Sequence, residues 1–204
     1  MRLGLPGALG HTDCDPSPRS DPTGSHRLGC KKAADARLRR HDAIAEVVAR
    51  TALAADPARV PDESSQARPG DVALDLGDGR TYVDVTVVNA FSAAHLSASR
   101  SAGSPAVAAE RAFNKKIEKY EPLFVVDPSL PGRKFVPLAV TALGVWDERS
   151  LRWLRRFSDV CAAASATDSG FAFASLMTKL SIALWRGNSR MMRAGLPVGQ
   201  PSWD

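Results

Sequence analysis

Two β runs joined by a tight-turn dipeptide constrain this chain more than any other feature. The segment Asp71–Val88 reads DVALDLGDGRTYVDVTVV, and both runs are rich in Val, Leu and Tyr. Asp78-Gly79 lies between them, and this dipeptide is favoured in two-residue hairpin loops. A two-residue loop fixes which residues face one another across the hairpin. The predicted facing pairs are Asp75 with Tyr82, Ala73 with Asp84, and Asp71 with Thr86.

The hairpin has one acidic face and one apolar face. Facing residues point to the same side of a sheet, and successive residues along a strand alternate sides. Asp71 and Asp84 therefore become diagonal neighbours, with β carbons roughly 5 to 8 Å apart. The acidic face is predicted to hold Asp71, Asp75, Asp84 and Thr86, and the core face Val72, Leu74, Val83, Val85 and Val87.

The acidic face suggests a metal site. Two carboxylates this close repel each other unless a cation lies between them. Their hard oxygen atoms suit Mg²⁺ or Mn²⁺, and such an ion can polarise a phosphate and generate hydroxide from bound water. The alternative is that Asp71 and Asp84 are solvated carboxylates on an exposed face. The hairpin alone leaves both interpretations open.

A lysine-bearing helix follows the hairpin. The periodicity predicts a helix over Pro105–Glu121, with Phe113 and Tyr120 on its buried stripe. Lys116 lies one turn from both aromatic residues, so it borders that stripe and could lean over the carboxylates. Equally, the lysines of this helix could form a solvated face.

The remaining segments add helices and one strand, which favours an α/β or α+β fold. Pro122 is expected to stop the lysine-bearing helix, and Pro137 indicates that the last strand lies at an edge or begins there. No apolar run reaches the ~20 residues needed to cross a bilayer. The expected elements are a helix over Lys31–Ala55, a mobile loop over Ser92–Ser104, a buried strand over Phe135–Gly144, and helices over Asp147–Ala164 and Phe171–Met192.

Composition excludes several classes of protein. The 204 residues carry 27 Lys and Arg against 22 Asp and Glu, a net charge of +5 that suits a polyanionic partner without requiring one. Three cysteines, an odd number, argue against a disulfide framework. Cys14 and Cys30 lie near histidines, which points to a metal, whereas Cys161 is expected to be a small buried hydrophobe. We expect a soluble protein that is not secreted.

Several motifs, taken in order, resemble a known nuclease family. RPGDVAL (68–74), YVDVTVVN (82–89) and ERAFNKKIEKY (110–120) resemble the restriction-like endonuclease domain that follows the reverse transcriptase in target-specific non-LTR retrotransposons. RHDAIAEVV (40–48) resembles the Arg-His helix that precedes this core in the family. The resemblance implies the PD-(D/E)XK class, which has a mixed sheet flanked by helices and a divalent-metal site that cuts phosphodiester bonds.

The resemblance also implies roles for individual residues. Asp71 and Asp84, with twelve residues between them, match the family's two acids and would hold Mg²⁺ or Mn²⁺. Thr86 stands where the wider class has its lysine, as is typical of this subfamily, so the cationic role would move to Lys116 or Lys119. The further catalytic candidates are Glu46 and Asp75, for which an ordinary exposed carboxylate is the alternative.

A zinc knuckle is implied at the N-terminus, because the family carries one directly before the Arg-His helix. Residues 1–30 are rich in Gly, Pro, Asp and Ser, and include GHTDC and GSHRLGC. Four nitrogen and sulfur ligands close a tetrahedral structural Zn²⁺ site, here with a histidine in the family's first cysteine position. Residues 31–194 would then be the nuclease domain and 195–204 a tail. The implied Zn²⁺ ligands are His11, Cys14, His26 and Cys30.

The implied function is nicking of target DNA, so that the freed 3′ hydroxyl primes reverse transcription. No polymerase segment is present, so we expect a C-terminal piece of a mobile element that acts in the nucleus, with element RNA and an upstream reverse transcriptase as further partners. One competing hypothesis is a zinc-stabilised nucleic-acid-binding remnant with an inactive core, and another is a DNA repair or recombination nuclease. The candidate DNA-contacting residues are Arg37, Arg39, Arg40, Arg186 and Arg190.

Overall fold

A computed structural model describes residues 28, 33–56, 58, 70–126 and 133–193. The described part is a mixed α/β fold with five helices and one small three-stranded sheet, which confirms the expected fold class at this level. Within it, no helix is both long enough and apolar enough to cross a membrane. The elements are α1 (Ala34–Ala55), β1 (Val72–Asp75), β2 (Arg80–Val88), α2 (Ala93–Ala102), α3 (Val107–Val126), β3 (Lys134–Thr141), α4 (Glu148–Ala164) and α5 (Ser169–Arg193).

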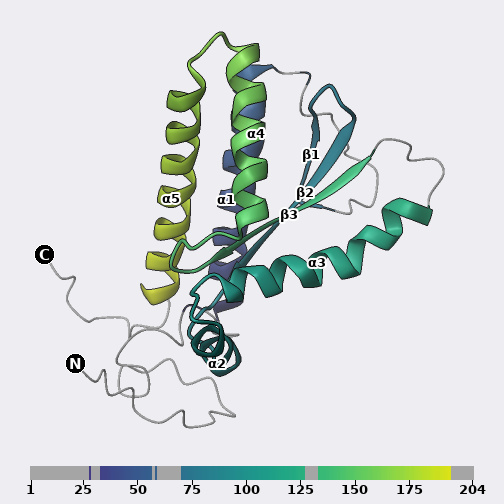
Figure 1. Cartoon of the computed structure of the whole chain (residues 1–204). Coiled ribbons are helices and arrows are strands. Elements are labelled where there is room, and N and C mark those ends of the chain that lie inside the picture. Colours follow the sequence, from purple (N-terminus) through teal and green to yellow (C-terminus); the bar gives the residue numbers. More distant parts are fainter. Residues whose placement is uncertain (1–27, 29–32, 57, 59–69, 127–132, 194–204) are drawn as a thin grey trace, which may run out of the picture.

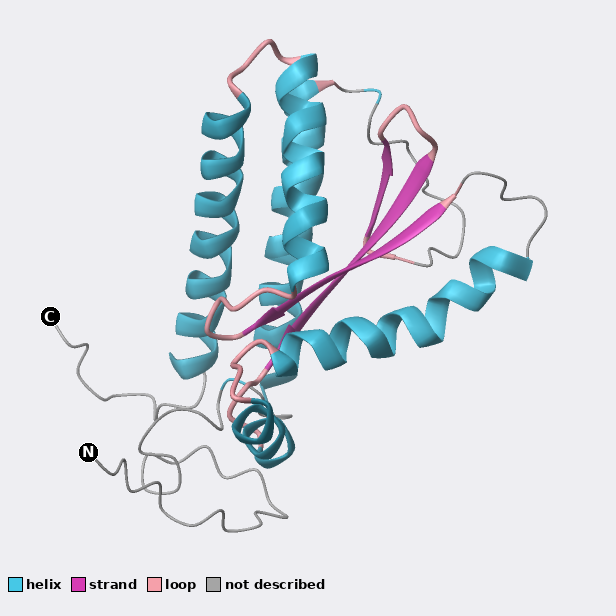
Figure 2. Ribbon diagram, in the orientation of Figure 1, coloured by secondary structure: helices cyan, strands magenta, loops and turns pink. Residues whose placement is uncertain are grey.

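The sheet is mixed and separates two layers of helices. Its strand order is β1-β2-β3, with β2 antiparallel to β1 and parallel to β3. A parallel pair needs a crossover connection, and α2 and α3 lie in that connection. Helices α1, α4 and α5 lie on one side of the sheet and α3 lies along the other (Figures 1 and 2).

Alternation along the strands divides the core in two. Val83 and Val85 of β2 are buried in a large cluster with residues of α1, α4 and α5, as the predicted core face requires. On the opposite face, Ala139 of β3 packs against Ala109 and Phe113 of α3. Both faces of the sheet are therefore covered, and the acidic face of the hairpin lies on the side of α3.

A buried polar joint links α1 to α5. Arg40 is only 1% exposed, and its Nη1 donates to Asn188 Oδ1 at 2.8 Å. Asn188 Nδ2 in turn donates to the carbonyl of Ala142 at 2.7 Å, in the loop after β3. Gly187 allows this close approach, because a Cβ there would overlap the Arg40 side chain. The joint holds the first turns of α1 against the C-terminal half of α5.

The hairpin turn is longer than predicted. Residues 76–79 separate the strands, so Asp75 faces Arg80 and Ala73 faces Tyr82. The predicted two-residue loop was wrong because the turn begins at Asp75, whose carboxylate accepts the N–H of Gly77, and both turn glycines adopt positive φ. Each pair moves by two positions, an even number, so the predicted faces are unchanged.

Two other boundary predictions were wrong. The expected mobile loop contains α2, which begins after Ser92, whose Oγ accepts from His95 N at 3.4 Å, and ends at Gly103 in the left-handed region. Pro122 does not stop α3, which continues to Val126. A proline inside a helix removes one hydrogen bond and strains the preceding turn, but it does not always end the helix, and α3 packs against β3.

Two smaller predictions are confirmed. Pro137 lies on β3, at one edge of the three-stranded sheet, where a missing N–H costs no ladder bond. Cys161 is buried in the large core cluster, as expected for a small hydrophobe.

Candidate active site

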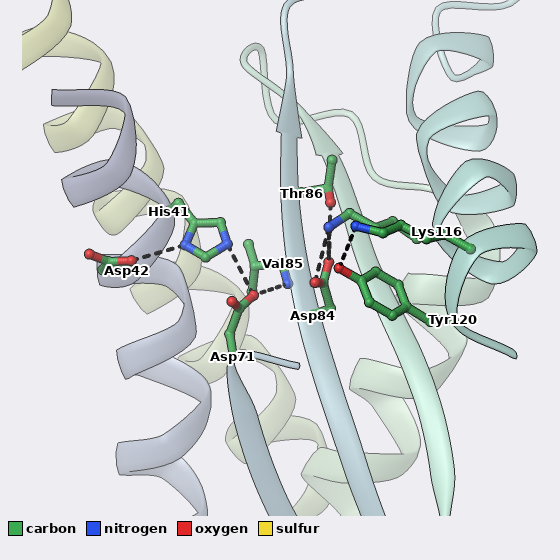
Figure 3. Close-up of polar contacts among 9 residues, drawn as sticks. His41, Asp42, Asp71, Asp84, Val85, Thr86, Lys116 and Tyr120 are labelled. Carbon is green, nitrogen blue, oxygen red and sulfur yellow. Dashed lines mark hydrogen bonds and ion pairs between the residues drawn. The ribbon is translucent and has the colours of Figure 1, made fainter. Parts of the chain in front are cut away.

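Asp71 is fixed by the backbone on either side of Asp84. The N–H of Asp71 donates to the Val83 carbonyl at 2.8 Å, and the N–H of Val85 donates to Asp71 Oδ2 at 2.6 Å. These two bonds place Asp71 beside Asp84 at the start of β1, as Figure 3 shows. The longer turn thus brings the two acids closer than the diagonal arrangement that was predicted.

Asp84 is a buried carboxylate held by a lysine. Only 6% of the residue is exposed. Lys116 Nζ lies 2.7 Å from Asp84 Oδ2 and 3.0 Å from Oδ1, and Thr86 Oγ1 donates to Oδ2 at 3.4 Å. Burial raises the pKa of Asp84, while Lys116 acts in the opposite direction. The nearby negative charge of Asp71 raises this pKa further.

Helix α3 positions Lys116. Phe113, one turn earlier, packs against the sheet, and the Tyr120 ring lies 4.9 Å from the Phe135 ring of β3. Lys116 stands between these two anchors and reaches Asp84 across the covered face. The ammonium also lies 5.4 Å from the centre of the Tyr120 ring. The buried stripe predicted for this helix therefore aims one lysine at the acids.

His41 of α1 completes the site from the opposite side. Its Nε2 lies 3.0 Å from Asp71 Oδ2 and its Nδ1 lies 3.0 Å from Asp42 Oδ1. The hydrogen bond to Asp71 raises the pKa of His41 to about 9, so the ring is an imidazolium at neutral pH. Sequence reasoning did not select His41. The signal for it was the Arg-His pair at the start of RHDAIAEVV.

A basic cleft adjoins the acids. Its volume is about 480 Å³, and it opens between α1 and the β2–α3 face. His41, which contacts Asp71, and Lys116 and Thr86, which contact Asp84, also line the cleft. Arg37 adds a further cation to the lining and Asp35 one acid. Cations around an open cleft attract an anionic ligand such as a phosphate, while the carboxylates beside it suit a bridging cation.

The other catalytic candidates are not brought into this group. Lys119 is exposed, and its Nζ donates to Tyr120 Oη at 3.0 Å, a hydrogen bond that raises the Lys119 pKa. Glu46 is exposed on α1 and pairs with Arg50 at 2.6 Å. Asp75 lies at the turn end of β1. Lys116 and Lys119 were both candidates for the cationic role, and Lys116 is the one that contacts an acid.

The arginine candidates separate into two kinds. Arg37, Arg39, Arg186 and Arg190 are exposed on α1 and α5. Arg40 is buried in the α1–α5 joint, and burial lowers its pKa to about 10. The expectation that Arg40 contacts DNA is therefore corrected, because its guanidinium is used inside the fold.

Asp71 and Asp84 could supply some of the ligands of a hard cation. Among the residues that the structure describes, no group of three or more His, Cys, Asp and Glu side chains is arranged to hold a metal. Mg²⁺, however, commonly uses one or two carboxylates together with water and phosphate oxygens. Asp71 and Asp84 fit that smaller requirement. The predicted Zn²⁺ ligands His11, Cys14, His26 and Cys30 lie outside the described residues.

Comparison with known proteins gives no assignment, since neither the known family models nor the curated proteins match this sequence.

The His41–Asp71 pair predicts a pH-dependent stability. Because the folded-state pKa of His41, about 9, lies above its ordinary value of 6.5, the pair stabilises the fold fully below pH 6.5 and loses this effect as the pH rises through 9. We expect the parent's free energy of unfolding to fall by about 2 kcal/mol more than that of His41→Gln between pH 7 and pH 10. Urea denaturation with chelator measures this difference, and parallel pH profiles for the two proteins would contradict it.

Proposed function

We propose that this protein is a divalent-metal-dependent DNA endonuclease that nicks one strand of its target. One observation carries the proposal: Asp71 and Asp84 lie side by side, with Lys116 Nζ 2.7 Å from Asp84, next to a basic cleft. Two adjacent acids and a lysine beside an open cleft are the elements that metal-assisted phosphodiester hydrolysis requires.

Each residue has a role that follows from its contacts. Asp71 and Asp84 would hold Mg²⁺, which when bound supplies Lewis-acid activation of water and charge stabilisation at the phosphate. Lys116 lines the cleft and contacts Asp84, so it can orient a phosphate oxygen or the attacking water. His41 orients the Asp71 carboxylate through its Nε2, and the Val85 N–H fixes the same oxygen.

The same proposal covers the fold family, the origin and the partners of the nuclease. The mixed three-stranded sheet has helices on both faces, with Asp71 directly before β1 and Asp84 on β2. This arrangement supports the restriction-endonuclease-like assignment that the motifs suggested. We accordingly propose a retrotransposon origin, DNA as substrate and action in the nucleus, with element RNA and a reverse transcriptase as partners. A Zn²⁺ knuckle at residues 1–30 belongs to this proposal.

A second candidate function is a nucleic-acid-binding module that does not cut. A specific observation favours it: both acids are already neutralised, Asp71 by His41 and Asp84 by Lys116. A cation would have to compete with these two ion pairs for the carboxylate oxygens. An inactive remnant would keep the ion pairs for stability and the basic cleft for binding.

Nicking of supercoiled plasmid separates the two functions. We expect the full chain to convert supercoiled DNA to the open circle in Mg²⁺, and to do so no faster than buffer when EDTA replaces Mg²⁺. Binding to the same plasmid, measured in EDTA, should weaken as salt rises. Salt-sensitive binding without any nicking in Mg²⁺ would instead establish the non-cutting module.

A further inference from the structure

Helix α5 carries a concentration of positive charge that the fold does not neutralise. Over Ser169–Arg193 it contains four Lys and Arg and no Asp or Glu. Arg186 and Arg190 are exposed, and neither forms an ion pair with any residue that the structure describes. By contrast, the exposed Arg50 and Arg152 pair with Glu46 and Glu148 on their own helices. Within the described part of the chain, no acid therefore compensates Arg186 or Arg190.

The two arginines lie close together on the helix. Arg186 and Arg190 are four positions apart, so they lie one turn from each other on the same side of α5. Like charges at this spacing repel each other, and α5 carries no acid to offset them, although the C-terminal end of a helix is itself favourable for cations. An anionic partner would remove the repulsion by charge complementarity.

An exposed tryptophan accompanies the arginines. Trp185 directly precedes Arg186 and is 54% exposed, although the neighbouring Leu184 and Gly187 are buried. Figure 1 shows α5 at the outer edge of the helical layer that it forms with α1 and α4. A large exposed indole offers a flat face to a ligand. Ile182 and Met192, which are also exposed, share its side of the helix, and Arg186 follows about a quarter of a turn further round, where it can contact a phosphate next to a stacked base.

We propose that the outer face of α5, defined by Trp185, Arg186 and Arg190, binds single-stranded nucleic acid. Trp185 stacks on one base, and the two arginines contact the flanking phosphates. A single strand is required because the bases of a duplex present only their edges in the grooves, whereas those of a single strand expose their ring faces. Binding on this face needs no cleavage, so it goes beyond the proposed nuclease activity.

The fold leaves this face of α5 open. The Arg40–Asn188 joint packs the opposite, buried side of this part of α5 against the start of α1. Arg186 and Arg190 are therefore exposed to solvent, where a ligand can reach them. A second copy of the chain fits this face poorly, since two acid-free helices would bring like charges together.

Fluorescence anisotropy with labelled 20-nucleotide oligo(dT) and oligo(U) tests the proposal on the full chain in EDTA. We expect Trp185→Ala to weaken binding about 5- to 100-fold, and Trp185→Phe to retain most of it, because a phenyl ring still stacks. The double variant Arg186→Ala/Arg190→Ala should lower the slope of log K against log salt by about 1.4. Arg152→Ala, which removes a paired exposed arginine, serves as the matched control and should bind like the parent.

Three results would overturn the proposal. The first is parental oligonucleotide affinity in Trp185→Ala, and the second is an unchanged salt slope in the double arginine variant. The third is that the Trp185-dependent ligand is something else: vesicles containing phosphatidylserine, or a second copy detected by light scattering, with no oligonucleotide bound. Plasmid nicking is scored separately, so a chain that does not nick but loses oligonucleotide binding in Trp185→Ala supports this proposal and contradicts the nuclease.

Discussion

Replacing Lys116 with Met is expected to lower the free energy of unfolding by about 2 to 3 kcal/mol. The substitution keeps the apolar stem of the side chain and removes only the ammonium, which lies 2.7 Å from Asp84 Oδ2. Among the side chains that the structure describes, Asp84, 6% exposed, would then keep only the weak 3.4 Å contact from Thr86. An uncompensated buried charge is costly, so the loss should greatly exceed that of an ordinary surface substitution.

A double-mutant cycle isolates the pair. Lys116→Met/Asp84→Asn should be more stable than Lys116→Met alone, because the amide removes the buried charge that the lysine neutralised. Lys119→Met, on the same helix, is the matched control, and we expect a change within about 0.5 kcal/mol because Lys119 is exposed. Urea denaturation at pH 7 without divalent metal is carried out on five proteins: the parent, Lys116→Met, Asp84→Asn, the double variant and Lys119→Met. Additive single changes would show that the Lys116–Asp84 contact contributes nothing.

The two faces of the hairpin were predictable because they depend on local alternation. Val83 and Val85 could be placed in the core, and Asp84 on the other face, from the period of two alone. The register was not predictable to the residue. It depends on where the chain enters the turn, and the Asp75 contact to the Gly77 N–H accompanies a turn that begins two residues earlier than predicted, while the second strand still begins at Arg80.

Helix positions were predictable where apolar periodicity was long, and α4 and α5 lie within two residues of their expected bounds at each end. The segment that became α2 carries small and polar residues with little apolar period, so composition favoured a loop. The composition did not indicate where α2 begins and ends. Ser92 caps the start, and Gly103 supplies the left-handed residue that ends the helix.

The residues of the site were predictable only where the pattern of a single hairpin or helix determines their position. Asp71, Asp84 and Lys116 could be selected from strand pairing and helix periodicity, but the choice between Lys116 and Lys119 depends on how α3 lies on the sheet. His41 reaches Asp71 from a helix thirty residues earlier in the chain. Such a contact is set by tertiary packing, which local patterns do not encode.

The most direct test of the central claim, that Asp71 and Asp84 form one metal-dependent cleavage site, is the rate of plasmid nicking in Mg²⁺ for three variants. Asp71→Asn and Asp84→Asn should each lower the rate by at least about 100-fold, because each removes a carboxylate that the cation requires. Asp75→Asn changes a carboxylate on the same predicted face but at the turn end of β1, so it should stay within about twofold of the parent. Circular dichroism confirms that each variant is folded. Parental nicking by a folded Asp71→Asn or Asp84→Asn protein, or loss of nicking in Asp75→Asn alone, would contradict the account.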